Sequence, residues 1–262
     1  MQLEGKAAIV TGAGSGVGQA TAVRLANLGM DVLVNYSRTK DGAEATVTEI
    51  ERVGRRAVAF QADIRDDTLV REMVAAAVGA FGRIDVLVNN AGATEFIPFD
   101  RLDDVTEDTW HRLLDINLLG PFHCTRAAAP VIKETAAKDG GEIVMVSSIA
   151  GILAVGSSIP YCASKAALNN MTVALARTLA PRIRVNAVAP GFITGRWLKD
   201  GLGEDNYQTI MQGFEDKLPL RRVCTPDDVA AAITGLITGS DLVTGQVLVC
   251  DGGMRIMAPI SI

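Results

Sequence analysis

The stretch Thr11-Gly12-Ala13-Gly14-Ser15-Gly16-Val17-Gly18 decides the fold of this chain. It follows a short apolar run, residues 7–10, and leads into a helical pattern. A glycine turn between a strand and a helix N-terminus brings backbone N–H groups close to an anion, which the helix dipole also favours. The spacing is T-G-x-x-x-G-x-G and not G-x-G-x-x-G. The loop predicts a pyrophosphate site made by Gly12, Ser15, Gly16, Val17 and Gly18.

Short β-branched runs recur along the rest of the chain and alternate with helical patterns. Several runs are apolar throughout, as in parallel strands covered on both faces, and the spacers are long enough for crossover helices. We therefore predict an α/β, doubly wound Rossmann fold, in which a seven-stranded, mainly parallel sheet has helices on both faces. The predicted strands are Ala7–Val10, Val32–Tyr36, Ala57–Gln61, Val86–Asn89, Glu142–Val146, Arg184–Val188 and Gln246–Val249. The predicted helices are Gly16–Leu28, Thr39–Val53, Asp67–Phe81, Thr106–Thr135, Tyr161–Leu179 and Pro226–Thr238.

The segment from Gly195 to Leu218 has no strand pattern. We expect it to form a substrate lid, within a single domain of residues 1–262, over the end of the sheet where such folds bind ligands. The apolar side chains in and near this segment either line a substrate pocket or form a core beneath the lid. They are Ile152, Leu153, Ile159, Phe192, Trp197, Tyr207 and Phe214.

The composition excludes several classes of protein. The chain is globular, with 48% hydrophobic and 21% charged residues, and its net charge of −5 argues against a nucleic-acid partner. Serines, glycines and a proline interrupt the uncharged stretch Ile143–Ser164, so we expect no membrane span. The N-terminus lacks a signal-peptide pattern, and we expect a cytoplasmic protein with four reduced cysteines. Neither the cysteines nor His111 and His123 have the spacing of a metal site.

Further motifs follow the glycine loop in a fixed order. They are Asp63, Asn89-Asn90-Ala91-Gly92, Asn117, Ser148, Tyr161-Cys162-Ala163-Ser164-Lys165, Pro190-Gly191 and Asp251-Gly252-Gly253. With the glycine loop, these motifs resemble the short-chain dehydrogenase/reductase family, and their order resembles its 3-oxoacyl-thioester reductases. The resemblance covers nearly the whole chain.

The chemistry of two of these residues follows from their spacing. Tyr161 and Lys165 are four apart at the start of a predicted helix, so their side chains share a face about 5–6 Å apart. An ammonium at that distance favours the phenolate, and we expect it to lower the tyrosine pKa from about 10. Tyr161 then acts as a general acid for carbonyl reduction or a general base for alcohol oxidation. Ser148 can stabilise charge on the substrate oxygen, and the hydride comes from a nicotinamide.

The resemblance implies a catalytic tetrad of Asn117, Ser148, Tyr161 and Lys165. In such a tetrad the asparagine anchors a water that links the lysine to solvent, and the lysine also holds the nicotinamide ribose. The resemblance also implies cofactor contacts from the loops after the other strands. Asp63 and Ile64 would contact the adenine ring, and Asn90, Ala91 and Gly92 would line the adenosine ribose.

The turn after the sixth predicted strand departs from the family pattern P-G-x-[VI]-x-T. It reads Pro190-Gly191-Phe192-Ile193-Thr194-Gly195, with glycine in the place of the threonine. We expect the backbone of Ile193 still to bind the nicotinamide carboxamide. Whether the displaced Thr194 makes a contact stays open.

The end of the second predicted strand indicates the cofactor. NAD-using relatives usually have an acid there, which bonds the ribose hydroxyls and repels a 2′-phosphate. This chain has no carboxylate between Val32 and Lys40, and Asp31 lies at the opposite end of the strand. Ser37 can donate a hydrogen bond, and Arg38 offers a planar cationic group suited to a phosphate. We therefore predict NADP(H), with NAD less favoured.

The sequence thus predicts an NADP(H)-dependent oxidoreductase that reduces a carbonyl or oxidises a secondary alcohol, with 3-oxoacyl thioesters as one candidate substrate class. Sugar, polyol and xenobiotic carbonyl dehydrogenases share these motifs, and a non-catalytic dinucleotide-binding regulator is the alternative of another class. The family's assembly through two long helices and the last strand implies a homotetramer. The tail, residues 257–262, either crosses a partner's pocket or caps a dimer.

Overall fold

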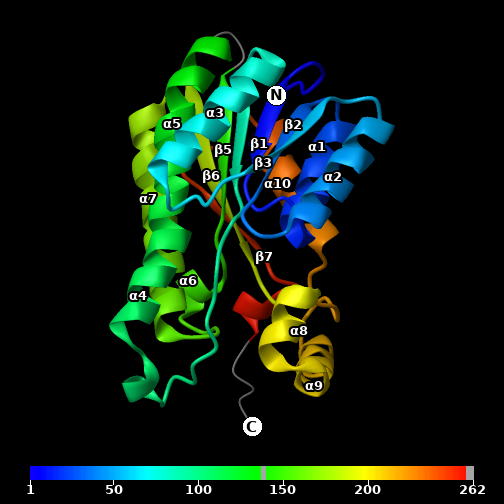
Figure 1. Ribbon diagram of the computed structural model, residues 1–262. Helices are drawn as coiled ribbons and strands as arrows, with labels where there is room; N and C mark the ends of the chain where they lie inside the picture. The colour runs from blue at the N-terminus through cyan, green and yellow to red at the C-terminus, as the bar shows by residue number, and fades with distance from the viewer. Residues whose placement is uncertain (137–139, 258–262) are drawn as a thin grey trace.

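The computed structural model describes residues 1–136 and 140–257, whose strands form one central sheet (Figure 1). The strands are β1 (Ala7–Val10), β2 (Asp31–Tyr36), β3 (Ala57–Gln61), β4 (Val86–Asn89), β5 (Gly141–Val146), β6 (Ile183–Pro190) and β7 (Val247–Cys250). Their order is β3-β2-β1-β4-β5-β6-β7, and every pairing is parallel. The predicted doubly wound fold is confirmed. Most of the C-terminal tail, residues 258–262, lies outside the described residues.

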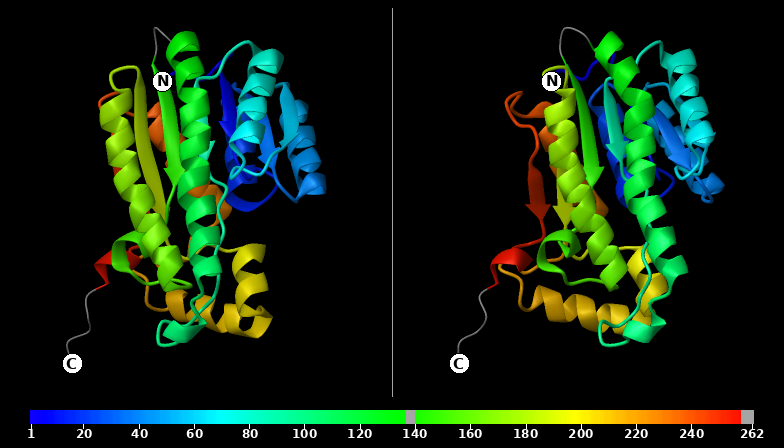
Figure 2. Two further views of the ribbon diagram at one scale, coloured as in Figure 1. Left: turned by 60° about the vertical axis from the view of Figure 1, so that its left-hand side comes forward. Right: turned by 90° about the vertical axis from the view of Figure 1, so that its left-hand side faces the viewer.

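Helices cover both faces of the sheet (Figure 2). One face packs against α1 (Gly16–Asn27), α2 (Lys40–Arg52) and α10 (Pro226–Thr238), and the other against α3 (Asp67–Phe81), α5 (Gly120–Thr135) and α7 (Ile159–Leu179). Successive strand residues point to opposite faces. Ile9 of β1 therefore joins the buried cluster beneath α3, α5 and α7, whereas Ala8 and Val10 join the other cluster.

The long helix predicted over Thr106–Thr135 is interrupted. The structure has α4 (Glu107–Leu114), a π-helical turn at Asp115–Leu119, and then α5. The cause is a tertiary contact, because the buried Asn117 side chain in this turn bonds both backbone groups of Ala93, with N–O distances of 2.8 and 2.9 Å. Single π-helical turns within helices occur often at functional sites.

Three short helices lie beyond the end of the sheet where β6 and β7 finish (Figure 1). They are α6 (Ala150–Leu153), α8 (Arg196–Leu202) and α9 (Glu204–Glu215). The last two occupy most of the segment expected to form a lid, residues 195–218. Among the described residues, no helix is long and apolar enough to cross a membrane.

Candidate active site

The glycine loop turns sharply between β1 and α1. Gly12 has φ of +64°, where a side chain would be strained, and its N–H donates to Oδ1 of Asn35 at 3.1 Å. A Cβ on Gly18 would lie 2.3 Å from the carbonyl oxygen of Gly12, so the helix can start this close to the loop only with glycine there. Ser15 is the N-cap residue of α1, and its side chain caps no N–H of the first turn. The loop therefore presents backbone donors at a helix N-terminus, as the sequence predicts for a pyrophosphate site.

Polar side chains lock this loop to the next one. The Oγ1 atom of Thr11 accepts from the N–H groups of Asn90 and Ala91 at 2.9 and 3.0 Å. The Asn90 amide donates to the carbonyl oxygens of Thr11 and Gly12 at 2.9 and 3.2 Å. The side chain of Asn90 and the N–H groups of Asn90 and Ala91 are thus engaged within the protein, which fixes the loop after β4 against the glycine loop. Sequence reasoning missed the buried Asn35, whose signal is a lone amide within an apolar strand.

The loop after β3 carries an ion pair. Nη2 of Arg65 lies 2.6 Å from Oδ2 of Asp63, and the hydrogen bonds from Arg65 hold the pKa of Asp63 below its usual value. Arg38 lowers this pKa as well, so the ends of β2 and β3 are close in space. Ile64 is 4% exposed and faces Gly120, and its carbonyl oxygen lies 3.2 Å from Nδ1 of His123. The Ile64 side chain therefore belongs to the core, and its N–H is the part that remains for a ligand.

The end of β2 is cationic. Ser37 and Arg38 are exposed there, and none of the ion pairs within residues 1–136 and 140–257 includes Arg38. Asp31 lies at the other end of the strand and pairs with Arg56, with Nη2 2.6 Å from Oδ2. The structure therefore places the Arg38 guanidinium near Asp63, beside the loop that follows β3, whereas the carboxylate of β2, Asp31, lies at the opposite end of the strand.

Ser148 and Tyr161 meet beyond the end of β5. Helix α7 brings the tyrosine there, because its N-cap Ser158 accepts from the N–H of Tyr161 at 3.4 Å. Burial raises the pKa of Tyr161 to about 12 and outweighs the effect of the Ser148 side chain, which is near enough to the phenol to favour its ionisation. This overturns the expectation that Lys165 lowers the pKa. Nζ of Lys165 lies 5.8 Å from the centroid of the ring, and burial dominates.

Lys165 and Asn117 lie behind the tyrosine. Lys165 is 3% exposed and donates to the carbonyl oxygen of Val146 at 2.9 Å, and burial lowers its pKa to about 8. The Asn117 amide donates to Oγ of Ser164 at 3.0 Å. A Cβ built on Gly92 would lie 3.2 Å from Oδ1 of Asn117 and 3.6 Å from Nζ of Lys165. The four residues expected to form a tetrad therefore gather at one place, beside the loop after β4.

The turn after β6 is held from two sides. Its Gly191 N–H donates to the carbonyl oxygen of Cys250 at 2.9 Å, and its Thr194 N–H donates to that of Cys224 at 2.8 Å. Between them, the N–H of Ile193 donates to no acceptor among the described residues. The structure thus leaves the backbone donor of Ile193 available while it engages that of Thr194.

Aromatic rings join the lid to this turn. Phe192 lies 5.7 Å from Tyr207 and 5.3 Å from Phe214, measured between ring centroids. Tyr207 is 2% exposed, and its hydroxyl accepts from the N–H of Gly195 at 3.3 Å. Tyr207 is therefore a core residue beneath the lid, and the half-buried rings of Phe192 and Phe214 lie beside it. Ile152 is 37% exposed, and the side chain of Trp197 lies outside the described residues.

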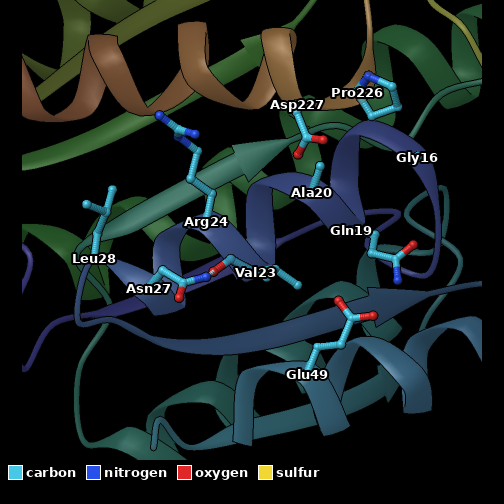
Figure 3. A pocket seen from close by; sticks show the side chains of 10 residues that line it. All are labelled: Gly16, Gln19, Ala20, Val23, Arg24, Asn27, Leu28, Glu49, Pro226 and Asp227. Carbon is cyan, nitrogen blue, oxygen red and sulfur yellow. Dashed lines mark hydrogen bonds between the residues drawn. The ribbon is translucent and has the colours of Figure 1, made fainter. Parts of the chain in front are cut away.

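A groove of about 700 Å³ between α1 and α10 adjoins the glycine loop from outside (Figure 3). Gly16 is the one predicted site residue that lines it, and its other lining residues are Gln19, Ala20, Val23, Arg24, Asn27, Leu28, Glu49, Pro226 and Asp227. Ser148, Tyr161 and Lys165 do not contribute to it, so the groove is separate from the tetrad.

Known proteins with similar sequences share this architecture. The chain matches the model of the short chain dehydrogenases over residues 6–202. It is 38% identical over 255 residues to the 3-oxoacyl-[acyl-carrier-protein] reductase of Synechocystis sp., covering 96% of this chain and 98% of that protein. It is 37% identical over 258 residues to the L-rhamnose 1-dehydrogenase (NAD(P)(+)) of Sphingomonas sp., covering 97% and 98%. The structure of a 7 alpha-hydroxysteroid dehydrogenase complexed with NADH and 7-oxo glycochenodeoxycholic acid has a TM-score of 0.87 at 32% identity, covering 96% and 95%.

Proposed function

The chain belongs to the short chain dehydrogenase family and is an oxidoreductase, and we propose that it reduces a carbonyl group with NADPH. The observation that carries this proposal is the gathering of Ser148, Tyr161 and Lys165 beside the loop after β4, with Nζ of Lys165 5.8 Å from the centroid of the Tyr161 ring. Burial raises the pKa of Tyr161 to about 12, which favours the protonated phenol as the proton donor in reduction. In alcohol oxidation the same group would take the proton back.

The residues present fit a dinucleotide. The close approach of Gly12 and Gly18 leaves donors of the first helical turn for the pyrophosphate, and Ser15, Gly16 and Val17 would share in holding it. Asp63, Ile64, Asn90, Ala91 and Gly92 would border the adenosine, and Pro190, Gly191 and Ile193 the nicotinamide end. When bound, the nicotinamide supplies the hydride. Ser37 and Arg38 would select the 2′-phosphate, because a guanidinium matches a phosphate in shape and charge.

In the proposed reaction, the residues of this chain act on the substrate carbonyl oxygen and on the proton that this oxygen receives. Ser148 donates a hydrogen bond to the substrate carbonyl oxygen and stabilises the negative charge that develops there. Tyr161 transfers its proton to that oxygen as the alcohol forms. Lys165, whose pKa of about 8 lies close to neutral pH, holds the cofactor ribose and restores the proton. Asn117 keeps the π-helical turn in place and links Lys165 to solvent through a water.

The substrate class rests on the relatives and on the lid. The relative from Synechocystis sp. acts on 3-oxoacyl groups carried by a protein, and the relative from Sphingomonas sp. acts on a sugar. Ile152 of α6 adds apolar surface beyond the end of the sheet, where it is 37% exposed, and we propose a 3-oxoacyl thioester ahead of a sugar or xenobiotic carbonyl. Acetoacetyl thioester, rhamnose lactone and a cyclic ketone, each assayed with both cofactors, separate these classes.

Arg38→Asp tests the cofactor assignment. The variant changes the local charge by two units beside a dianion, and each pair of unit charges about 4 Å apart contributes about 1 kcal/mol in water. The charge change of two units and the two charges of the phosphate make four such pairs, so we expect the ratio of kcat/KM for NADPH to that for NADH to fall by about a thousandfold, which corresponds to about 4 kcal/mol. Lys40→Asp is the matched control, because Lys40 is also exposed but its Nζ lies 3.6 Å from Glu44. Wild-type efficiency with NADH equal to that with NADPH would overturn the assignment.

We further propose that each chain folds as a single domain and that the protein is a cytoplasmic homotetramer. Exposed apolar side chains on α5, α7 and β7 support such an assembly, with Phe122 37%, Val173 41% and Leu248 41% exposed. Four free cysteines support a reducing compartment. Light scattering after gel filtration measures the assembly, and a monomeric mass at micromolar concentration would exclude the tetramer.

A further inference from the structure

Two of the four cysteines lie side by side although 26 residues separate them. Cys224 precedes α10 and Cys250 ends β7, and the thiol of Cys224 donates to the carbonyl oxygen of Cys250 at 3.1 Å. The thiol of Cys250 points to the carbonyl oxygen of Asp228, at 4.0 Å, and each thiol affects the pKa of the other. Both line one cavity of about 300 Å³, together with Arg222 and Asp228. The fold therefore creates a dithiol that no spacing in the sequence indicates.

The backbones of these two cysteines hold the turn after β6. Cys250 accepts from Gly191 at 2.9 Å, and Cys224 accepts from Thr194 at 2.8 Å and donates to Phe192 at 2.9 Å. Within the described residues, the N–H groups of Phe192 and Ile193 in the middle of this turn donate to no acceptor. A change in the distance between the two cysteines would therefore move the turn that carries Ile193.

We propose that Cys224 and Cys250 are a modification site, a dithiol that a hydroperoxide oxidises to a disulfide, and that this disulfide weakens cofactor binding at the turn after β6. The second part rests on the proposed function, and the first part does not. In the first step the Cys250 sulfur attacks a peroxide oxygen, the S–O bond forms, the O–O bond breaks, and water or an alcohol leaves. In the second step the Cys224 sulfur attacks the sulfenic acid, the S–S bond forms, and a second water leaves. Two thiols are oxidised and one peroxide is reduced.

The environment distinguishes the two thiols. Cys250 is partly exposed in the cavity, and the neighbouring Cys224 thiol, with Arg222 adding to it, lowers the pKa of Cys250 although burial, Asp228 and Asp251 oppose this. Cys224 is 5% exposed, and the neighbouring Cys250 thiol and burial raise its pKa. Cys250 is therefore the attacking thiol and Cys224 the resolving one.

The other cysteines differ from this pair. Cys124 is completely buried, and burial raises its pKa to about 12. Cys162 is 7% exposed, and burial raises its pKa as well. Neither has a second thiol as a partner among the residues that the structure describes, so Cys162→Ser provides a matched control.

The experiment treats the full-length protein with about a tenfold molar excess of hydrogen peroxide and then quantifies thiols and maps disulfides by mass spectrometry. We expect a loss of two thiols and a Cys224–Cys250 crosslink in the wild type and in Cys162→Ser, and neither in Cys250→Ser or Cys224→Ala. Absence of the crosslink from the wild type, or a crosslink between other cysteines, would overturn the site.

The second readout is the dissociation constant for NADPH from fluorescence titration. We expect oxidation to raise it at least about threefold and a dithiol reductant to restore it, with no change in Cys250→Ser. A crosslinked protein with an unchanged constant would overturn the effect on the turn. If the reduced protein binds no NADPH, the proposed function fails, whereas the crosslink still decides the modification site.

Discussion

Tyr161→Phe separates chemistry from folding and binding. The change removes one hydroxyl near Ser148 and keeps the ring, so the free energy of unfolding should fall by only about 1 kcal/mol. Loss of the proton donor should lower kcat for carbonyl reduction by about 10²–10⁴-fold, which is about 3–5 kcal/mol of transition-state stabilisation. Absorbance of NADPH measures turnover, urea denaturation measures stability, and fluorescence titration measures cofactor binding, which should change less than about threefold.

The pH dependence sharpens this test. With a pKa of about 12, about one phenol in 10⁵ is ionised at pH 7, so Tyr161 itself should add no pH dependence to reduction between about pH 6 and 9. Any inflection near pH 8 then belongs to Lys165, whose pKa burial lowers to about 8. Wild-type turnover in Tyr161→Phe would refute the assignment of the proton donor. A reduction rate that falls tenfold per pH unit above about pH 7 and no longer does so in Tyr161→Phe would refute the raised pKa.

Three further predictions follow from buried or engaged groups. Lys165→Met should lower kcat and NADPH affinity each by about tenfold or more, and an effect on only one of them would contradict its two roles. Thr194→Ala should change the dissociation constant of NADPH by less than about tenfold, or about 1.4 kcal/mol, because the backbone N–H of Thr194 donates to Cys224. Burial raises the pKa of Glu142 from 4.5 to about 8 despite Arg184 at 3.0 Å, so its contribution to stability should be lost as pH rises from 4.5 to 8. Urea denaturation at pH 4.5 and at pH 8 should show that the free energy of unfolding falls less in Glu142→Gln than in the wild type. An equal fall in both proteins would contradict the raised pKa of Glu142.

The strands were predictable because parallel strands buried on both faces read as apolar runs. The bounds of β1, β3 and β4 agree with the prediction, whereas β6 extends two residues further, to Pro190. The added residues pair with β7, and Pro190 pairs with Cys250. The local sequence pattern cannot predict this contact, because the two strands are far apart in the sequence. The π-helical turn at Asn117 has the same kind of cause, because the side chain bonds Ala93, 24 residues away.

The gathering of Ser148, Tyr161 and Lys165 was also predictable, since the carboxyl ends of parallel strands meet at one edge of a sheet. The pKa shifts of Tyr161 and Lys165 were not predictable. Spacing along a helix gives the separation of Tyr161 and Lys165 but not how deeply each side chain is buried, and burial opposes the charged form of both. A prediction of the Tyr161 pKa from spacing alone therefore overestimates the attraction between ammonium and phenolate and omits the larger desolvation cost.

The turn after β6 shows how the fold accommodates a change of sequence. Relatives place a threonine where this chain has Gly195, and the N–H of Gly195 is instead bonded by the hydroxyl of Tyr207 in α9. Thr194, one residue earlier, is tied to Cys224 through its backbone. The lid and the segment before α10 thus fix both residues that follow Ile193, and the free N–H of Ile193 is positioned without a threonine hydroxyl. Movement of the lid would therefore reach the proposed nicotinamide site through Tyr207 and Phe214, which both contact Phe192 in this turn.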